Sequence, residues 1–91
     1  FISLKIVLPA VMQLAAPGAW MVALIKPQFE VGKENIGKGG IVRTPELHEQ
    51  VCDDIRRWLS DDMKWHVLGI TESPITGAEG NKEFLIAARR D

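Results

Sequence analysis

The chain has 91 residues, of which 46% are hydrophobic and 25% are charged, and its formal net charge is -1. A chain of this length forms at most one small domain with a marginal core, so we expect a partner or a missing half to complete it. The near-neutral charge excludes a general attraction to nucleic acid or to a membrane surface, and any affinity for nucleic acid must therefore be local. No apolar run reaches the ~18 residues that span a bilayer, so the sequence predicts no membrane partner.

The single cysteine, Cys52, excludes an intramolecular disulfide and is consistent with a reducing cytoplasm. Because it falls in a predicted helix, we interpret it as a buried structural thiol and not as a nucleophile. His48 and His66 lack the spacing of metal ligands and have no cysteine or carboxylate cluster to join. The sequence therefore predicts no metal site.

The first two predicted elements are a helix and a strand. Residues 3–15 have the pattern of a helix with Ser3 as a possible N-cap, but an interior proline costs about 3 kcal/mol, so Pro9 predicts a kink or a later start near Val7 or Leu8. Residues 19–25 form a nearly unbroken apolar run, which is typical of a strand buried on both faces. Lys26 and the proline after it end this strand.

Residues 28–43 show neither helical nor strand periodicity and contain four glycines, which predicts a long loop. A loop of more than ~12 residues in a compact domain is usually functional or disordered. Two interpretations remain open for its basic residues, Lys33, Lys38 and Arg43. They bind RNA phosphates, with the glycines allowing close approach of the backbone, or they belong to a mobile solvated loop.

A second helix is predicted to begin at Thr44 as N-cap, with Pro45 in the first helical position, and to fade near residues 60–63. Apolar residues recur on it at a spacing of four, with Trp58 beside them, and indicate the face that packs on the core. This apolar stripe consists of Leu47, Val51, Ile55 and Leu59. The charged residues between them are interpreted as its solvated face, and they are Asp53, Asp54, Arg56 and Arg57.

Residues 65–71 and 83–88 have the pattern of two further strands, joined by a turn-rich connection over residues 73–81. Because a helix joins the first strand to the second, these two should run in the same direction. The last two are joined without a helix and should form an antiparallel hairpin. The sequence thus predicts an α/β domain with a mixed sheet that ends in an antiparallel hairpin.

Five short words extend this interpretation: Phe-Ile-Ser-Leu-Lys at 1–5, Val-Ala-Leu-Ile-Lys-Pro-Gln-Phe-Glu at 22–30, Gly-Lys-Gly-Gly at 37–40, Ser-Pro-Ile-Thr-Gly at 73–77 and Asn-Lys-Glu-Phe-Leu at 81–85. Together they resemble the hemolysin A (TlyA) branch of the FtsJ-like methyltransferases over essentially the whole chain. The resemblance implies the C-terminal half of a Rossmann-like methyltransferase fold, with the final strand between the two before it. It also implies S-adenosylmethionine-dependent methylation of a ribose 2′-hydroxyl in ribosomal RNA. The hemolysin name describes a phenotype and not a chemistry.

The family uses a Lys-Asp-Lys-Glu tetrad, and the resemblance assigns its second lysine to Lys26 and its glutamate to Glu83. The aspartate, the first lysine, the S-adenosylmethionine-binding half and an S4-like RNA-binding domain would all lie before Phe1. Residues 1–91 are accordingly expected to be the C-terminal part of the methyltransferase domain and to be inactive alone. A ribose hydroxyl is a poor nucleophile that must lose its proton as it attacks, which is why a lysine is wanted as base or to orient the oxygen.

Two other classes stay open, a non-catalytic RNA-binding or interaction module and a structural remnant without activity. In the plainest interpretation Lys26 merely ends a strand and Glu83 is a surface charge on an exposed strand. The strand at residues 19–25 would lack a neighbour in this chain and would leave an apolar edge with unpaired backbone groups. We therefore expect a homo-oligomer formed through that edge.

Overall fold

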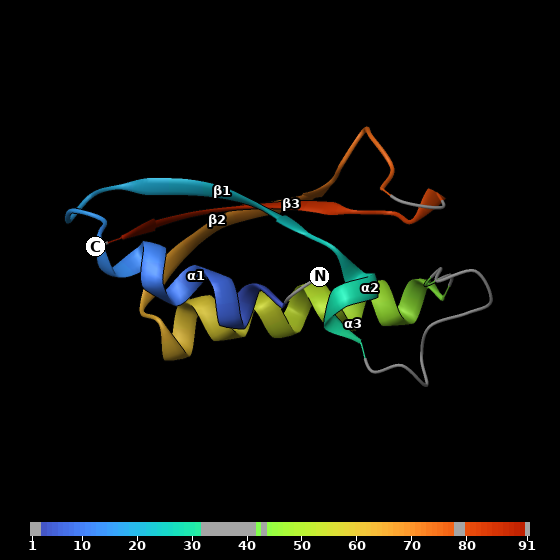
Figure 1. Ribbon diagram of the computed structural model, residues 1–91, viewed down its shortest axis with the longest axis horizontal. Helices are drawn as coiled ribbons and strands as arrows, with labels where there is room; N and C mark the ends of the chain where they lie inside the picture. Colours follow the sequence, from blue (N-terminus) through green and yellow to red (C-terminus); the bar gives the residue numbers. More distant parts are fainter. Residues whose placement is uncertain (1–2, 32–41, 43, 78–79, 91) are drawn as a thin grey trace.

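The computed structural model describes residues 3–31, 42, 44–77 and 80–90. It has two layers, because the helices all lie on one face of a three-stranded sheet (Figure 1). In chain order the elements are α1 (Leu4–Gln13), β1 (Trp20–Ile25), α2 (Pro27–Glu30), α3 (Pro45–Arg57), the π-helical turn η2 (Trp58–Asp62), β2 (Trp65–Glu72) and β3 (Phe84–Arg90). None of the helices in this described part is long and apolar enough to cross a membrane.

The sheet has the strand order β1-β3-β2, and β3 is antiparallel to both neighbours. β1 and β2 therefore run in the same direction, as predicted, and the final strand lies between the two before it (Figure 1). No parallel neighbours occur among the described strands. The mixed sheet of a complete Rossmann-like fold accordingly stays a prediction.

β2 contains a bulge that keeps its apolar side chains on the covered face. The register shifts between Val67, which pairs with Ala88, and Gly69, which pairs with the preceding residue of β3. A bulge inserts one extra residue and so resets the alternation of side chains across a strand. Val67 and Ile70 can consequently both pack against the core although they are an odd number of residues apart.

The prediction that the first strand is buried on both faces is wrong. On β1 the side chains of Trp20 and Val22 are 71% and 55% exposed, whereas Ile25 is fully buried. The apolar run alone could not reveal this difference, because it specifies what both faces of the strand are made of and not what covers them. The described helices pack on one face of the sheet and leave the other bare (Figure 1).

The first helix begins at Leu4 and runs through Pro9, so the alternative start near Val7 or Leu8 is wrong. Ser3 is its N-cap and accepts a hydrogen bond from the Lys5 backbone N–H. A second cap comes from α2, because Glu30 Oε2 accepts from the Leu4 N–H at 2.9 Å and Glu30 Oε1 accepts from Ser3 Oγ at 2.5 Å. These bonds satisfy donors that a helix start otherwise leaves free, which stabilises the early start.

The long helix matches its predicted pattern. Val51, Ile55 and Leu59 are buried against the sheet, and Leu47 is half-buried, so the apolar stripe is confirmed as core. Trp58 packs against the same cluster from η2, where the helix loosens near its predicted end. Thr44 is the N-cap residue, although its side chain makes no capping hydrogen bond.

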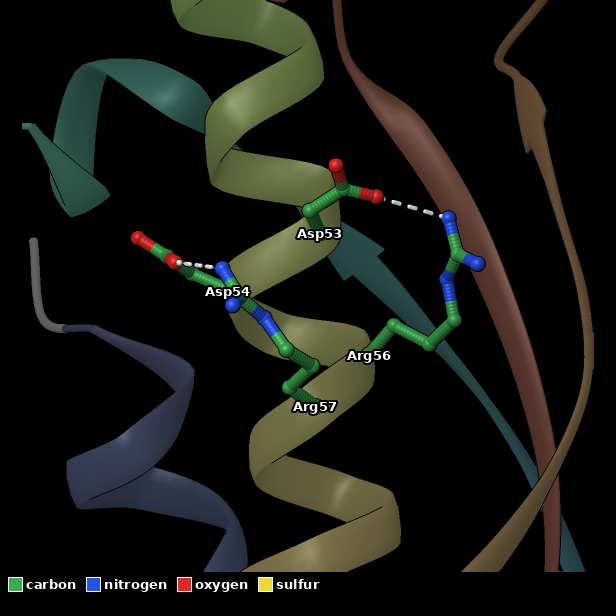
Figure 2. A network of polar contacts seen from close by, with 4 residues as sticks. All are labelled: Asp53, Asp54, Arg56 and Arg57. Atoms are coloured by element: carbon green, nitrogen blue, oxygen red, sulfur yellow. Dashed lines mark hydrogen bonds and ion pairs between the residues drawn. The ribbon is translucent and has the colours of Figure 1, made fainter.

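The solvated face of α3 is also confirmed. Figure 2 shows its two ion pairs, Asp53 with Arg56 at 2.8 Å and Asp54 with Arg57 at 3.1 Å. Each joins side chains three residues apart that are roughly half exposed or more. Such surface pairs contribute little to stability. Because this face of α3 is charged, it has no apolar surface to bury.

Candidate active site

The two residues assigned to the tetrad lie at the same end of the sheet. Ile25, the last residue of β1, pairs with Phe84, the first residue of β3. Because the strands are antiparallel, the next position outward along this register sets Lys26 opposite Glu83. Residues far apart in the sequence are thus brought together by the pairing of β1 with β3.

Glu83 is buried, with 5% of its surface exposed, and immediately precedes β3. Its carboxylate oxygen Oε2 accepts a hydrogen bond at 3.2 Å from Nε2 of Gln28, which lies on α2 and is 9% exposed. The interpretation of Glu83 as a surface charge on an exposed strand is therefore wrong. A buried carboxylate needs such donors, because removal from water is costly for a charged group.

Lys26 is half-buried and occupies the N-cap position of α2. Its Nζ lies 5.6 Å from the centroid of the Phe29 ring on α2, which is a cation-π contact. No ion pair joins Lys26 to Glu83 in the described part of the chain. The two side chains thus share one end of the sheet without a direct bond between them.

The connection between β2 and β3 folds back on Glu83. The Ser73 N–H donates to the Glu83 carbonyl at 2.8 Å, and the Gly77 N–H donates to the Asn81 carbonyl at 2.8 Å. Gly77 lies so close to Glu83 that a Cβ added to it would be 1.8 Å from Oε2 and 2.4 Å from Cδ. A side chain at position 77 would therefore occupy the space of the carboxylate.

A layer of buried polar contacts joins the segment between β2 and β3 to α3. Asn81 is 2% exposed, and its Oδ1 accepts from the Val42 N–H at 2.8 Å. The carbonyl of Val42 in turn lies 2.8 Å from Nε2 of the buried His48, whose ring packs 5.7 Å from that of Phe84. His48 thus has a structural place in the fold. No cluster of three or more possible metal ligands occurs among the described residues.

The predicted loop begins later than expected. Residues 27–30 form α2, so the prediction of loop structure from residue 28 onward is wrong at its start. A proline at the first helical position favours a helix there, and that signal stood in the sequence at Pro27. The three basic residues proposed to bind RNA, Lys33, Lys38 and Arg43, lie outside the described residues.

Sequence reasoning missed the parts played by Gln28, Gly77 and Asn81. All three stand inside words quoted for the resemblance, but no spacing rule connects a glutamine after the first strand with a glycine before the last. The only local signal was the position of Gln28 in the first turn after a strand end. Their roles appear only in the folded chain, where Gln28 and Gly77 lie at Glu83 and the Asn81 carbonyl accepts from the Gly77 N–H.

The sequence profile described as FtsJ-like methyltransferase matches residues 1–90. The chain belongs to the FtsJ-like methyltransferase family. Three relatives are similar to this family member. YqxC of Bacillus subtilis (strain 168), named for a proposed rRNA methyltransferase activity, is 46% identical over 88 residues, which cover 94% of this chain and 30% of YqxC. The 16S/23S rRNA (cytidine-2′-O)-methyltransferase TlyA of Mycobacterium tuberculosis (strain ATCC 25618 / H37Rv) is 42% identical over 98% of this chain and 33% of its own. Hemolysin A of Brachyspira hyodysenteriae is 35% identical over 93% of this chain and 35% of its own.

Solved structures agree with the family membership. A crystal structure of a Lactococcus lactis protein described as a candidate hemolysin superposes with a TM-score of 0.92 at 38% identity, covering 99% of this chain and 42% of that one. A similar protein from Streptococcus thermophilus gives 0.89 at 43% identity, covering 98% of this chain and 32% of its own. This member of the FtsJ-like family thus spans about a third of the length of the curated relatives it matches.

Proposed function

We propose that this chain supplies part of the active site of an S-adenosylmethionine-dependent rRNA ribose 2′-O-methyltransferase. The observation that carries the proposal is the placement of Lys26 opposite Glu83, with Glu83 buried and hydrogen-bonded. The burial of Glu83 at a strand end supports a functional role, because glutamate is almost never fully buried unless it has a partner. The printed name of the TlyA relative specifies 2′-O-methylation of rRNA cytidine, and this supports the same substrate class here.

The proposed chemistry assigns each side chain a task. Lys26 contacts the ribose 2′-hydroxyl and orients its oxygen for attack, and the carboxyl group of Glu83 keeps the lysine and the hydroxyl in line. S-adenosylmethionine, when bound, supplies an electrophilic methyl group. The hydroxyl must lose its proton as it attacks. For the rate, the precise placement of the Lys26 and Glu83 side chains therefore matters more than their exposure to solvent.

The site of the methyl donor is proposed to lie outside the described residues. Neither Lys26 nor Glu83 lines the hollows that the described residues form beside α3 and on the bare face of the sheet. On this proposal the remaining two thirds of the relatives' length provide the donor site. On the same proposal residues 1–91 alone are inactive, the enzyme acts in the cytoplasm where rRNA is made, and Lys33, Lys38 and Arg43 bind RNA.

Methyl transfer to rRNA tests the proposal directly. The assay uses the longest natural form of the protein and compares Lys26→Ala and Glu83→Ala with the unmodified enzyme. We expect each substitution to lower the rate by about 10²-fold or more, the size of effect typical for a positioned catalytic group. Lys82→Ala is the matched control, since Lys82 is exposed beside Glu83 and makes only a 3.9 Å ion pair with Glu72.

Full activity in both site variants would contradict the catalytic assignment. In that case RNA binding that survives in the same variants would favour a non-catalytic RNA-binding or interaction module. Loss of activity in Lys82→Ala to the same degree would show that the assay reports general damage to this end of the sheet.

A further inference from the structure

We propose that Gln28 and Gly77 are positioning residues for Glu83, Gln28 through a hydrogen bond to the carboxylate and Gly77 by leaving the space in which it lies. The inference rests on the proposed function and names the specific groups that hold the carboxylate of Glu83. It joins the Lys-Pro-Gln and Ile-Thr-Gly words of the sequence into one structural unit.

The hydrogen bond has a definite direction. Nε2 of Gln28 donates to Oε2 of Glu83 at 3.2 Å, and both residues are at least nine-tenths buried. The reversed carboxamide would set its oxygen against the carboxylate oxygen, so the buried charge favours the orientation observed. This one hydrogen bond therefore fixes the side chain of Gln28 as firmly as it fixes the side chain of Glu83.

The other end of the same carboxamide argues against a purely structural bond. Oε1 of Gln28 is buried and has no hydrogen-bond partner among the described residues. Buried polar atoms in folded proteins almost always have a partner, and an exception calls for an explanation. An acceptor left open beside Glu83 suits a hydroxyl or ammonium donor that arrives when the site is complete.

Gly77 leaves free the space in which the same carboxylate lies. Among the described glycines only Gly18 and Gly80 have a positive φ, so alanine at position 77 meets no backbone strain. Its Cβ would instead lie 1.8 Å from Oε2 of Glu83. Because the obstructed atom is the end of a flexible side chain, we expect Gly77→Ala to fold and to displace the carboxylate.

Double-mutant cycles for methyl transfer separate positioning from general packing. We expect Gln28→Met and Gly77→Ala each to lower kcat about tenfold, the effect of losing a hydrogen bond to a charged group, with KM for RNA changed less than about twofold. Glu83→Gln should lower kcat further, and adding either substitution to it should cause no extra loss, because both act through Glu83.

Matched controls of the same residue types lie elsewhere in the chain. Gln50 is an exposed glutamine on α3, and a Cβ at Gly69 would meet no atom within 4 Å, so Gln50→Met and Gly69→Ala should retain full kcat. Urea unfolding of every variant verifies that it folds.

Each outcome bears on one claim. Losses that add independently to that of Glu83→Gln would overturn the positioning role, as would unchanged kcat in Gln28→Met and Gly77→Ala while Glu83→Gln is impaired. Unchanged kcat in Glu83→Gln itself would overturn the proposed function first, and the positioning role with it.

Discussion

At the scale of single residues, burial decides the chemistry of the only thiol. Cys52 lies on the inner face of α3 and is 9% exposed, as the sequence predicted for a structural cysteine. Desolvation, followed by the charge of Asp53, raises its pKa above 9.0, and the nearby Arg56 only partly opposes this. The thiolate is the reactive form of cysteine, so burial and the raised pKa both lower the reactivity of this thiol.

The first prediction concerns this thiol. In the native protein at about pH 7.5 we expect alkylation of Cys52 to be more than about tenfold slower than in the urea-unfolded chain, because the folded thiol is both covered and protonated. Asp53→Asn should raise the native rate slightly, since it removes one cause of the pKa shift. Asp54→Asn, on the solvent side of the same turn, is the control and should leave the rate unchanged.

The raised pKa of Cys52 also determines the direction in which the free energy of unfolding changes with pH. Because the folded-state pKa is raised, the folded protein retains the Cys52 proton at a pH where the unfolded chain releases it. The free energy of unfolding contributed by this group is thus complete below pH 9.0 and falls as the pH rises through the folded value. The stability advantage of the unmodified protein over Cys52→Ala should accordingly shrink in alkaline urea titrations, and an advantage that grows would contradict the burial assignment.

At the scale of elements, the shortest helix organises the site. α2 has four residues, yet it carries Gln28, which bonds Glu83, and Glu30, which caps α1. A helix of this length is not stable by itself, so its conformation depends on these contacts with elements on both sides. The capping bonds and the site contacts are therefore parts of one small structure.

The second prediction concerns the cap. Glu30→Ala removes the acceptors for the Leu4 N–H and for the Ser3 hydroxyl, and it should lower the free energy of unfolding by about 1–2 kcal/mol, the usual cost of a lost cap. Urea unfolding monitored by circular dichroism measures this loss. Glu30→Gln retains an acceptor and should lose less.

Asp54→Asn serves as the comparison for an exposed carboxylate. Its ion pair with Arg57 is open to solvent (Figure 2), and removing it should cost less than about 0.5 kcal/mol. Equal losses in Glu30→Ala and Asp54→Asn would show that Glu30 does not act as a cap.

At the scale of the whole molecule, the sheet is covered on one face and open at an edge. β1 has β3 on one side and no described strand on the other, and Trp20, Val22 and Leu68 are more than half exposed on the uncovered face. An edge strand with unpaired backbone groups, next to an exposed apolar face, is a template for association with another chain. The expected oligomer through residues 19–25 therefore remains a prediction that this arrangement supports.

The third prediction is that two copies of residues 1–91, expressed alone, associate with each other through their β1 strands. Sedimentation at rising concentration should show dimers or larger species, and Val22→Lys should shift the distribution toward monomer because a charge on an edge strand opposes pairing. Val11→Lys is the control, since Val11 is a similarly exposed valine on α1, 61% against 55%. A monomer at all concentrations, or equal effects of both lysines, would contradict association through this edge.

The sequence by itself determined the order and type of most elements, the inner face of α3 and the direction of the strands. Periodicity, capping residues and the lack of a helix between the last two strands are local properties, and local properties are visible in one chain. The resemblance also named Lys26 and Glu83. Only the tertiary structure decided which face of β1 is covered, how Glu30 fixes the start of α1, and that Gln28 and Gly77 meet at Glu83. Those outcomes depend on how the elements pack against one another, through contacts such as Glu30 with Leu4 and Gln28 with Glu83 that no spacing in the sequence encodes.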